Sequence, residues 1–252
     1  MIKLIKSIAN NKVQDVKRWA THRGLLKGHT EYTKFVVLCR SRVGSNLLLS
    51  YLNSHANIVS HNEIFGTAID AAAKQKIAEN PIDYIKDVAY GIYDENVKAV
   101  GFKIFYYHAK EAHTKVVWEY LKSTERLKVI HLRRENMLRT FLSKKIAGKT
   151  KKWEQVGKIN AVKADKKAVM LTKEECLEAF QKTKTWELEG SQFFVDHDVH
   201  EVSYEQLVKN PGMVLNEIQK FLEVDKFELS AYLTKQNPEP LSVLIEDYAK
   251  LK

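Results

Sequence analysis

The apolar residues of this chain fall into short continuous runs that alternate with stretches of helical period. KFVVLC at 34–39 is rich in β-branched residues, which is typical of a strand buried on both faces. Three more strands are predicted by AVGFKIF at 99–105, KVIHL at 128–132 and VHEVSY at 199–204. The segments between these strands have helical patterns, at 81–90, 111–122 and 135–147.

Two later helices have start signals of their own. Thr172 and Glu175 have capping-box spacing at the head of TKEECLEAFQKT. Pro211 stands near the first position of the helix predicted by GMVLNEIQKFL. Strands separated by helices, without Asn-Gly hairpin turns, predict βαβ units. The expected fold is therefore α/β with a central, mainly parallel sheet, in a single domain over 1–252.

Composition narrows the protein class. Of the 252 residues 44% are apolar, and the chain has only 10 Gly and 4 Pro, which favours a helix-rich globular domain over disorder. No apolar run approaches the ~20 residues of a membrane-spanning helix, and the N-terminus lacks the apolar core of a signal peptide. Cys39 and Cys176 have neither metal nor redox spacing. We expect a cytoplasmic protein without a transmembrane segment or a bound metal.

The net charge of +10 is concentrated in two segments. Residues 1–34 hold eight Lys/Arg against two acids, and 144–167 hold nine Lys against two acids. Such segments bind nucleic acid, anionic lipid or an anionic cofactor, or they are only solvated surface. The lysine-rich stretch 148–170 is interpreted as an insertion or a flexible loop, and 3–27 as a possible basic helix.

The strongest local motif is RSRVGSN at 40–46, between the first strand and a helix. A strand that enters a helix through such a turn leaves free backbone N–H groups at the positive end of the helix dipole. Gly44 allows close backbone approach, Ser45 and Asn46 offer donors, and Arg40 and Arg42 supply charge. The turn is not a Walker A motif, because it lacks the first Gly and the Lys. It predicts a phosphate site or, more simply, a helix cap.

A second motif places two arginines directly after a predicted strand. Arg133 and Arg134 follow KVIHL, and Ser143 lies on the next helix. The arginine fork matches phosphate oxygens, and parallel sheets place ligands at the carboxyl ends of their strands. These arginines would otherwise be a solvated strand end.

Together the two motifs resemble the sulfotransferases that use 3′-phosphoadenosine 5′-phosphosulfate (PAPS). RVGSNLL at 42–48 is similar to the 5′-phosphosulfate loop of that family, and the spacing from Arg134 to Ser143 is similar to its 3′-phosphate motif, with one residue more than the commonest form. Three further stretches resemble the bacterial carbohydrate sulfotransferases that modify nodulation factors, lipopolysaccharide and glycolipids: HNEIF (61–65), VGFKIFYYH (100–108) and VSYEQLVKNP (202–211). The matches cover roughly 35–224 in the family's order.

The chain also departs from the cytosolic branch of that family. Arg42 stands where that branch has a lysine, as in the carbohydrate branch, and the Gly-rich C-terminal loop of the cytosolic enzymes is missing. The resemblance implies a P-loop-like three-layer sandwich.

The resemblance also implies site residues. Glu63 is expected as the general base, with His108 and His61 as rivals, and Arg42 and Lys103 as cations on the sulfonate and the leaving phosphate. Trp153 and the lysines around it would line the acceptor cleft. The residues expected to bind PAPS are Arg40, Arg42, Val43, Gly44, Ser45, Asn46, Arg134, Ser143 and Tyr204.

The implied activity is sulfuryl transfer from PAPS to a hydroxyl of a carbohydrate or glycolipid. A P-loop kinase shares the strand–loop–helix but needs the Walker lysine that is missing. A basic nucleic-acid or membrane-surface binder would use the two lysine-rich segments, although aromatic stacking residues are not interleaved there. We therefore expect no nucleic-acid partner, leave peripheral membrane contact open, and find no sequence signal for an oligomeric state.

Overall fold

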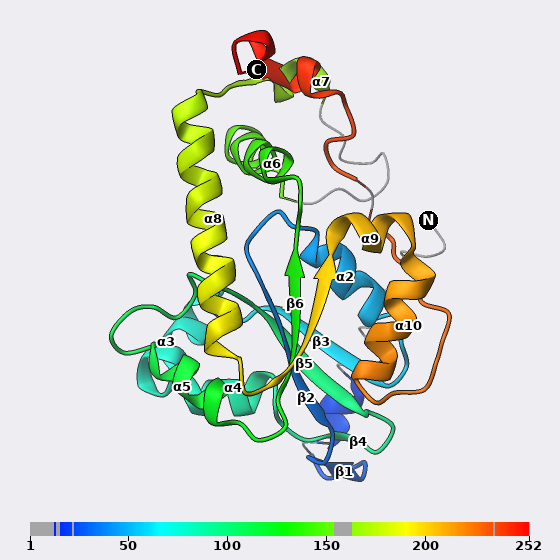
Figure 1. The fold of residues 1–252 in the computed structure, drawn as a ribbon. Coiled ribbons are helices and arrows are strands. Elements are labelled where there is room, and N and C mark those ends of the chain that lie inside the picture. The colour runs from blue at the N-terminus through cyan, green and yellow to red at the C-terminus, as the bar shows by residue number, and fades with distance from the viewer. Residues whose placement is uncertain (1–12, 14–15, 22, 154–162, 234, 252) are drawn as a thin grey trace.

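The computed structural model describes residues 13, 16–21, 23–153, 163–233 and 235–251 (Figure 1). At its centre is a five-stranded sheet of order β3-β5-β2-β6-β8, and neighbouring strands all pair in parallel. The strands are β2 (Thr33–Cys39), β3 (Ile58–Glu63), β5 (Ala99–Phe105), β6 (Lys128–Arg133) and β8 (Asp198–Ser203). The predicted α/β fold with a parallel central sheet is confirmed.

Four of these strands lie within one residue of their predicted bounds, and β3 was missed. Phe35 to Cys39 of β2 are all buried, as the apolar run predicts. In β3 the polar sequence SHNE breaks the apolar pattern after Val59. Because β3 is the edge strand beside β5, it is stabilised by pairing on one side and needs no continuous apolar run.

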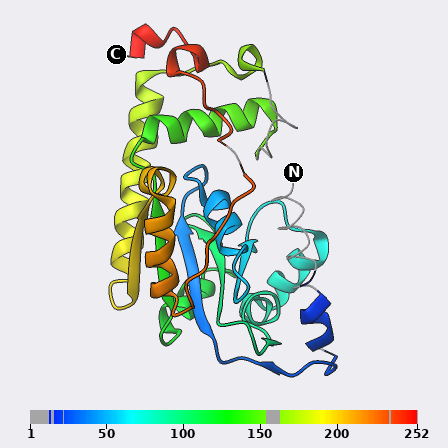
Figure 2. The same ribbon diagram turned by 90° about the vertical axis from the view of Figure 1, so that its right-hand side faces the viewer.

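Helices cover both faces of the sheet (Figure 2). On one face, the even-numbered apolar residues of β2 pack with α3 (Ala71–Glu79), α4 (Pro81–Val88), α5 (Val116–Ser123) and the end of α8 (Lys173–Phe193). On the other face, the odd-numbered residues of β2 pack with α2 (Ser45–Leu52), α9 (Tyr204–Lys209) and α10 (Pro211–Phe221). The period of two along β2 therefore divides the core into two clusters.

A third apolar cluster lies beyond the carboxyl ends of the strands. It joins α6 (Met137–Thr150) and the start of α8 to a two-stranded sheet of β7 (Val169–Met170) and β9 (Ile245–Glu246), with α7 (Ala164–Lys167) and α11 (Leu241–Leu244) beside them. The predicted loop at 148–170 is thus partly wrong, because α6, α7 and β7 occupy its two ends; 154–162 lie outside the described residues.

Several helix ends follow their sequence signals. Thr172 and Glu175 form the predicted capping box, and Pro211 is in the first turn of α10. The helix α8 continues to Phe193, ten residues past the predicted segment, while α5 begins only at Val116 because 111–115 form turns.

The N-terminal part is only partly described. Residues 16–21 are helical, and the chain then enters β1 (Gly28–His29), which pairs antiparallel with β4 (Tyr93–Asp94). The predicted helix over 3–27 falls largely outside the described residues. The short helix η1 (Tyr248–Leu251) ends the described chain. No helix of the described part is long and apolar enough to cross a membrane.

Candidate active site

A cavity of about 1570 Å³ opens at the carboxyl ends of the central strands. Its walls come from the loop after β2, the ends of β3 and β5, the helices α6 and α8, and the chain at 233 and 235–237. Seven of the nine residues expected to bind PAPS line it: Arg42, Gly44, Ser45, Asn46, Arg134, Ser143 and Tyr204. Glu63, Lys103 and Trp153 line it too. The fold therefore brings most of the predicted site into one cavity.

The loop between β2 and α2 brings the start of α2 to the cavity. Gly44 has φ +93, and a Cβ there would lie 2.3 Å from Cδ2 of the Tyr204 ring, so only glycine fits. No side chain caps the N-terminus of α2, and its first turn contains no acid. The first-turn N–H groups and the positive helix end therefore adjoin the cavity where Ser45 and Asn46 line it.

At one end of the cavity, Arg42, Arg134 and Ser143 form a connected cluster. Arg42 Nε donates to Ser143 Oγ at 2.9 Å, and Arg134 Nη1 donates to the Arg42 carbonyl at 3.1 Å. The Arg134 guanidinium lies 4.4 Å from the centroid of the Tyr204 ring. Burial lowers the pKa of Arg134, and its Nε has no hydrogen-bond partner among the described residues. The nearest acid is Glu205, 3.8 Å from that nitrogen.

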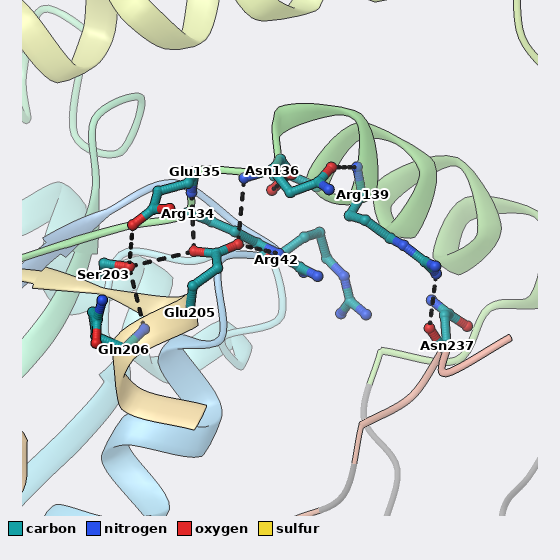
Figure 3. A network of polar contacts seen from close by, with 10 residues as sticks. Arg42, Arg134, Glu135, Asn136, Arg139, Ser203, Glu205, Gln206 and Asn237 are labelled. Atoms are coloured by element: carbon teal, nitrogen blue, oxygen red, sulfur yellow. Dashed lines mark hydrogen bonds and ion pairs between the residues drawn. The ribbon is translucent and has the colours of Figure 1, made fainter. Parts of the chain in front are cut away.

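Figure 3 shows how Glu205 orders this end of the cavity. Its carboxylate accepts from the backbone N–H groups of Glu135 at 3.0 Å and Asn136 at 3.3 Å. It thereby holds the turn between β6 and α6, which carries Arg134. The carboxylate is occupied by this structural task, so the guanidinium beside it keeps binding capacity for a ligand anion.

Sequence reasoning missed the C-terminal contribution to this cluster. Arg139 donates to the carbonyl of Asn237 at 3.4 Å (Figure 3) and to that of Glu239 at 2.7 Å. The Asn237 amide donates to Ser143 Oγ at 3.3 Å. Gln236 accepts from Arg42. Nothing in KQNPEP signals a binding function, because its partners are about 70 to 190 residues away in sequence.

Lys235 adds a further cation to the same end. Burial lowers the pKa of its ammonium, and the positive charges of Arg139 and Arg134 lower it further. Cations that lower one another's pKa in this way are stabilised by a bound anion. This end of the cavity thus suits a doubly charged phosphate.

At the other end, Lys103 and Glu63 form an ion pair. Lys103 is 1% exposed, its Nζ lies 3.0 Å from Glu63 Oε1, and it also donates to Asn46 Oδ1. The two residues are register partners on β5 and β3, across an irregularity at His61/Glu63. The Glu63 side chain is 35% exposed, so its carboxylate reaches the cavity while Lys103 stays buried.

His108 lies beside this pair with its ring orientation fixed. Its Nδ1 accepts from the backbone N–H of Phe105 at 3.3 Å, which places the proton of the neutral ring on Nε2. Burial lowers the pKa of His108 to about 4, so the ring is neutral at pH 7 and its Nε2, 3.9 Å from Glu63 Oε2, carries a hydrogen. Neither nitrogen is then an available base, which favours Glu63.

Three predicted residues point away from the cavity. His61 Nε2 lies 2.8 Å from the Tyr93 hydroxyl in the core, and burial lowers its pKa to about 3. Arg40 donates to Thr183 on α8, and Val43 is 1% exposed within the core cluster of α2. His61 is therefore placed away from the reacting groups, and Arg40 and Val43 offer no side chain to the lining defined by the described residues.

Comparisons with known proteins give similar folds only. No protein-family model matches the sequence, and no curated protein matches it significantly. A sulfotransferase from Alicyclobacillus acidocaldarius is 14% identical with a TM-score of 0.49, covering 82% of this chain and 87% of its own. Mouse sulfotransferase SULT7A1 complexed with PAP is 15% identical with a TM-score of 0.44, covering 81% and 62%. The sulfotransferase domain of the curacin biosynthetic pathway is 18% identical with a TM-score of 0.44, covering 78% and 75%.

Proposed function

We propose that this protein is a PAPS-dependent sulfotransferase that acts on a hydroxyl group of a carbohydrate or glycolipid. The observation that carries the proposal is the two-ended cavity. Arg42, Arg134 and Ser143 gather at one end, and the Lys103–Glu63 pair lies at the other, beside the uncapped start of α2.

The residues at each end fit the two charged ends of PAPS. The Arg134 Nε donor, which has no hydrogen-bond partner among the described residues, and the crowded cations around Lys235 call for an anion with several acceptor oxygens. Arg134 and Ser143 would hold the 3′-phosphate, Gly44 to Asn46 would hold the 5′ end, and Tyr204 would contact the adenosine. PAPS would supply the activated sulfuryl group.

The chain's own groups divide the chemical work at the sulfonate end. In-line sulfuryl transfer resembles phosphoryl transfer, so the protein contributes position and charge more than covalent chemistry. Glu63 would accept the proton of the acceptor hydroxyl through its solvent-facing carboxylate. Lys103 would stabilise the negative charge on the sulfonate and the leaving phosphate. Arg42, which the sequence resemblance implies for the same role, instead donates to Ser143 in the cluster at the opposite end. The carbohydrate acceptor follows from the sequence resemblance, and Trp153, which lines the cavity, offers it a ring.

The direct test of this function is nucleotide binding. Adenosine 3′,5′-bisphosphate should raise the melting temperature, since a ligand at 100 times its dissociation constant stabilises the fold by ~2.7 kcal/mol. Adenosine 5′-monophosphate should give a much smaller shift, because it leaves the Arg134 cluster empty. Thermal unfolding with each nucleotide in turn checks this. Equal shifts would refute the 3′-phosphate assignment, and a larger shift with ATP and Mg²⁺ would favour a kinase.

Arg134→Ala should weaken binding of the bisphosphate by about 1.5–3 kcal/mol, the range for hydrogen bonds to charged groups. Calorimetric titration measures the loss directly. Arg133→Ala is the matched control: the neighbouring guanidinium lies on Glu201, its Nε 2.8 Å from the carboxylate, and is not part of the cavity lining. It should leave the affinity unchanged. Unchanged affinity with a lowered melting temperature in Arg134→Ala would make that residue structural instead.

A further inference from the structure

One wall of the cavity is aromatic and begins beside the proposed base. The Tyr107 and Trp186 rings lie 5.2 Å apart between centroids, and both line the cavity. Tyr107 in turn packs edge-on against His108 at 5.4 Å, and His108 adjoins Glu63. An acceptor that offers a hydroxyl to Glu63 therefore lies along this wall.

Two lysines of the cavity lining, Lys182 and Lys144, add positive charge near the aromatic wall. Lys182 precedes Trp186 by one turn of α8, with its Nζ 5.1 Å from the Trp186 centroid. Lys144 belongs to α6, and both lysines line the cavity. Burial lowers the pKa of Lys144, and the nearby charges of Arg40, Lys182 and Lys145 add to the effect. Lys144 and Lys182 thus lie close enough to repel one another while no anion is bound.

A buried guanidinium lies beneath the same wall. Arg40 is 4% exposed, and its Cζ lies 6.0 Å from the Trp186 centroid. Its Nη1 donates to Thr183, and its Nε has no hydrogen-bond partner among the residues described. A buried charge without full pairing is costly in a protein interior. A negatively charged group on a ligand would offset this cost.

The acidic residues of the cavity do not neutralise the positive charge of Arg40, Lys144 and Lys182. The described acids in the lining are Glu63, which is held by Lys103, and the exposed Glu111. Glu187 on α8 is a counter-charge of Arg40 but is not part of that lining, and it offsets one positive charge against the three of Arg40, Lys144 and Lys182. The basic aromatic wall, defined as Tyr107, Trp186, Lys144, Lys182 and the underlying Arg40, therefore has a net positive charge.

This positive charge is not needed for the two phosphate ends of PAPS. Those ends are matched by the Arg134–Ser143 cluster and by the α2 start with Lys103. Resting on the proposed function, we propose that the acceptor carries an anionic group, a carboxylate or a phosphate ester, which Lys144 and Lys182 bind while the apolar face of the acceptor packs on Trp186 and Tyr107. The acceptor class narrows from any carbohydrate or glycolipid to an acidic sugar or a sugar phosphate.

Matched probes test this inference. The protein, saturated with adenosine 3′,5′-bisphosphate, is titrated calorimetrically with 4-nitrophenyl β-D-glucoside, the corresponding β-D-glucuronide and the glucoside 6-phosphate, which differ only at the sixth carbon. We expect either anionic probe to bind about tenfold or more tightly than the neutral one, with a preference that declines as salt is added. The stronger of the two anionic probes identifies the group that the wall selects.

Substitutions then test whether the basic aromatic wall causes the preference for the anionic probes. Lys144→Met with Lys182→Met should reduce the preference to about twofold or less, while bisphosphate affinity remains. Lys184→Met, an exposed lysine of α8 that is not part of the lining, is the control for net charge and should change nothing. Equal binding of all three probes, no binding of either anionic probe, or a preference that survives the double substitution would overturn the inference. Failure of the bisphosphate to bind would instead refute the proposed function, and the same probes on the protein alone would still report on the wall.

Discussion

Glu63→Gln is expected to lower the turnover number for sulfuryl transfer by about 10²–10⁴, the usual contribution of a positioned general base. The substitution keeps the size of the side chain and an oxygen that accepts from Lys103, and it removes the carboxylate that takes the proton. Bisphosphate affinity should therefore stay nearly intact. Release of adenosine 3′,5′-bisphosphate from PAPS with an active acceptor measures the turnover number.

Two control variants make the Glu63 result specific. Glu111→Gln removes an exposed acid of the same cavity lining and should leave turnover unchanged. His108→Gln should cost far less than Glu63→Gln, because the backbone N–H of Phe105 occupies Nδ1 and the proton occupies Nε2. If His108→Gln abolishes transfer and Glu63→Gln does not, the base is His108.

Lys103→Met is expected to lower the turnover number by about 10²–10³, the usual loss when one charge-stabilising donor is removed from an active site. It should not lower the melting temperature. Lys103 is 1% exposed, and replacing a buried ammonium with an apolar side chain of similar length removes a desolvation cost, while Glu63 can turn to solvent. Turnover and thermal unfolding together separate a catalytic cation from a structural one.

The control for Lys103 is Lys74→Met, an exposed lysine that also lines the cavity. It changes the cavity charge by the same amount and should have little effect on turnover. A variant of Lys103 that unfolds more easily but turns over normally would show that the ion pair with Glu63 serves the fold only.

The sheet could be predicted because its buried strands have the strongest sequence signal. β2, β5 and β6 are short runs of mostly apolar residues whose inner positions are buried, and both faces of the central strand β2 must be covered. β3 could not be predicted in the same way. Its polar residues serve the site, with Glu63 at the strand's end, and an edge strand gains its stability from β5 and not from its own pattern.

The predicted residues that line the cavity lie in strands, in strand–helix turns or on the helix that follows. Gly44 and Arg134 lie in such turns and Ser143 lies on the following helix α6, so local sequence placed them among the residues that line the cavity. Arg40 has the same kind of position but turns under Trp186, because packing against α8 decides its direction. Lys235 to Asn237 left no local signal, since their role depends on tertiary contacts with α6 and the β2–α2 loop.

The long-range contacts of residues 235–239 bear on the order in which the parts of this protein fold. Arg42 and Gln236 are hydrogen-bonded at the cavity although 194 residues separate them in sequence. Lys167 Nζ lies 2.7 Å from Glu239 Oε1. Closing so long a loop is entropically costly until the sheet is already formed. During synthesis residues 235–251 emerge after every strand of the central sheet, so the sheet can form before this wall of the cavity is added. A chain clipped after Leu233 would keep both faces of the sheet covered, yet it would lack the segment that holds Arg42 and Ser143 in place.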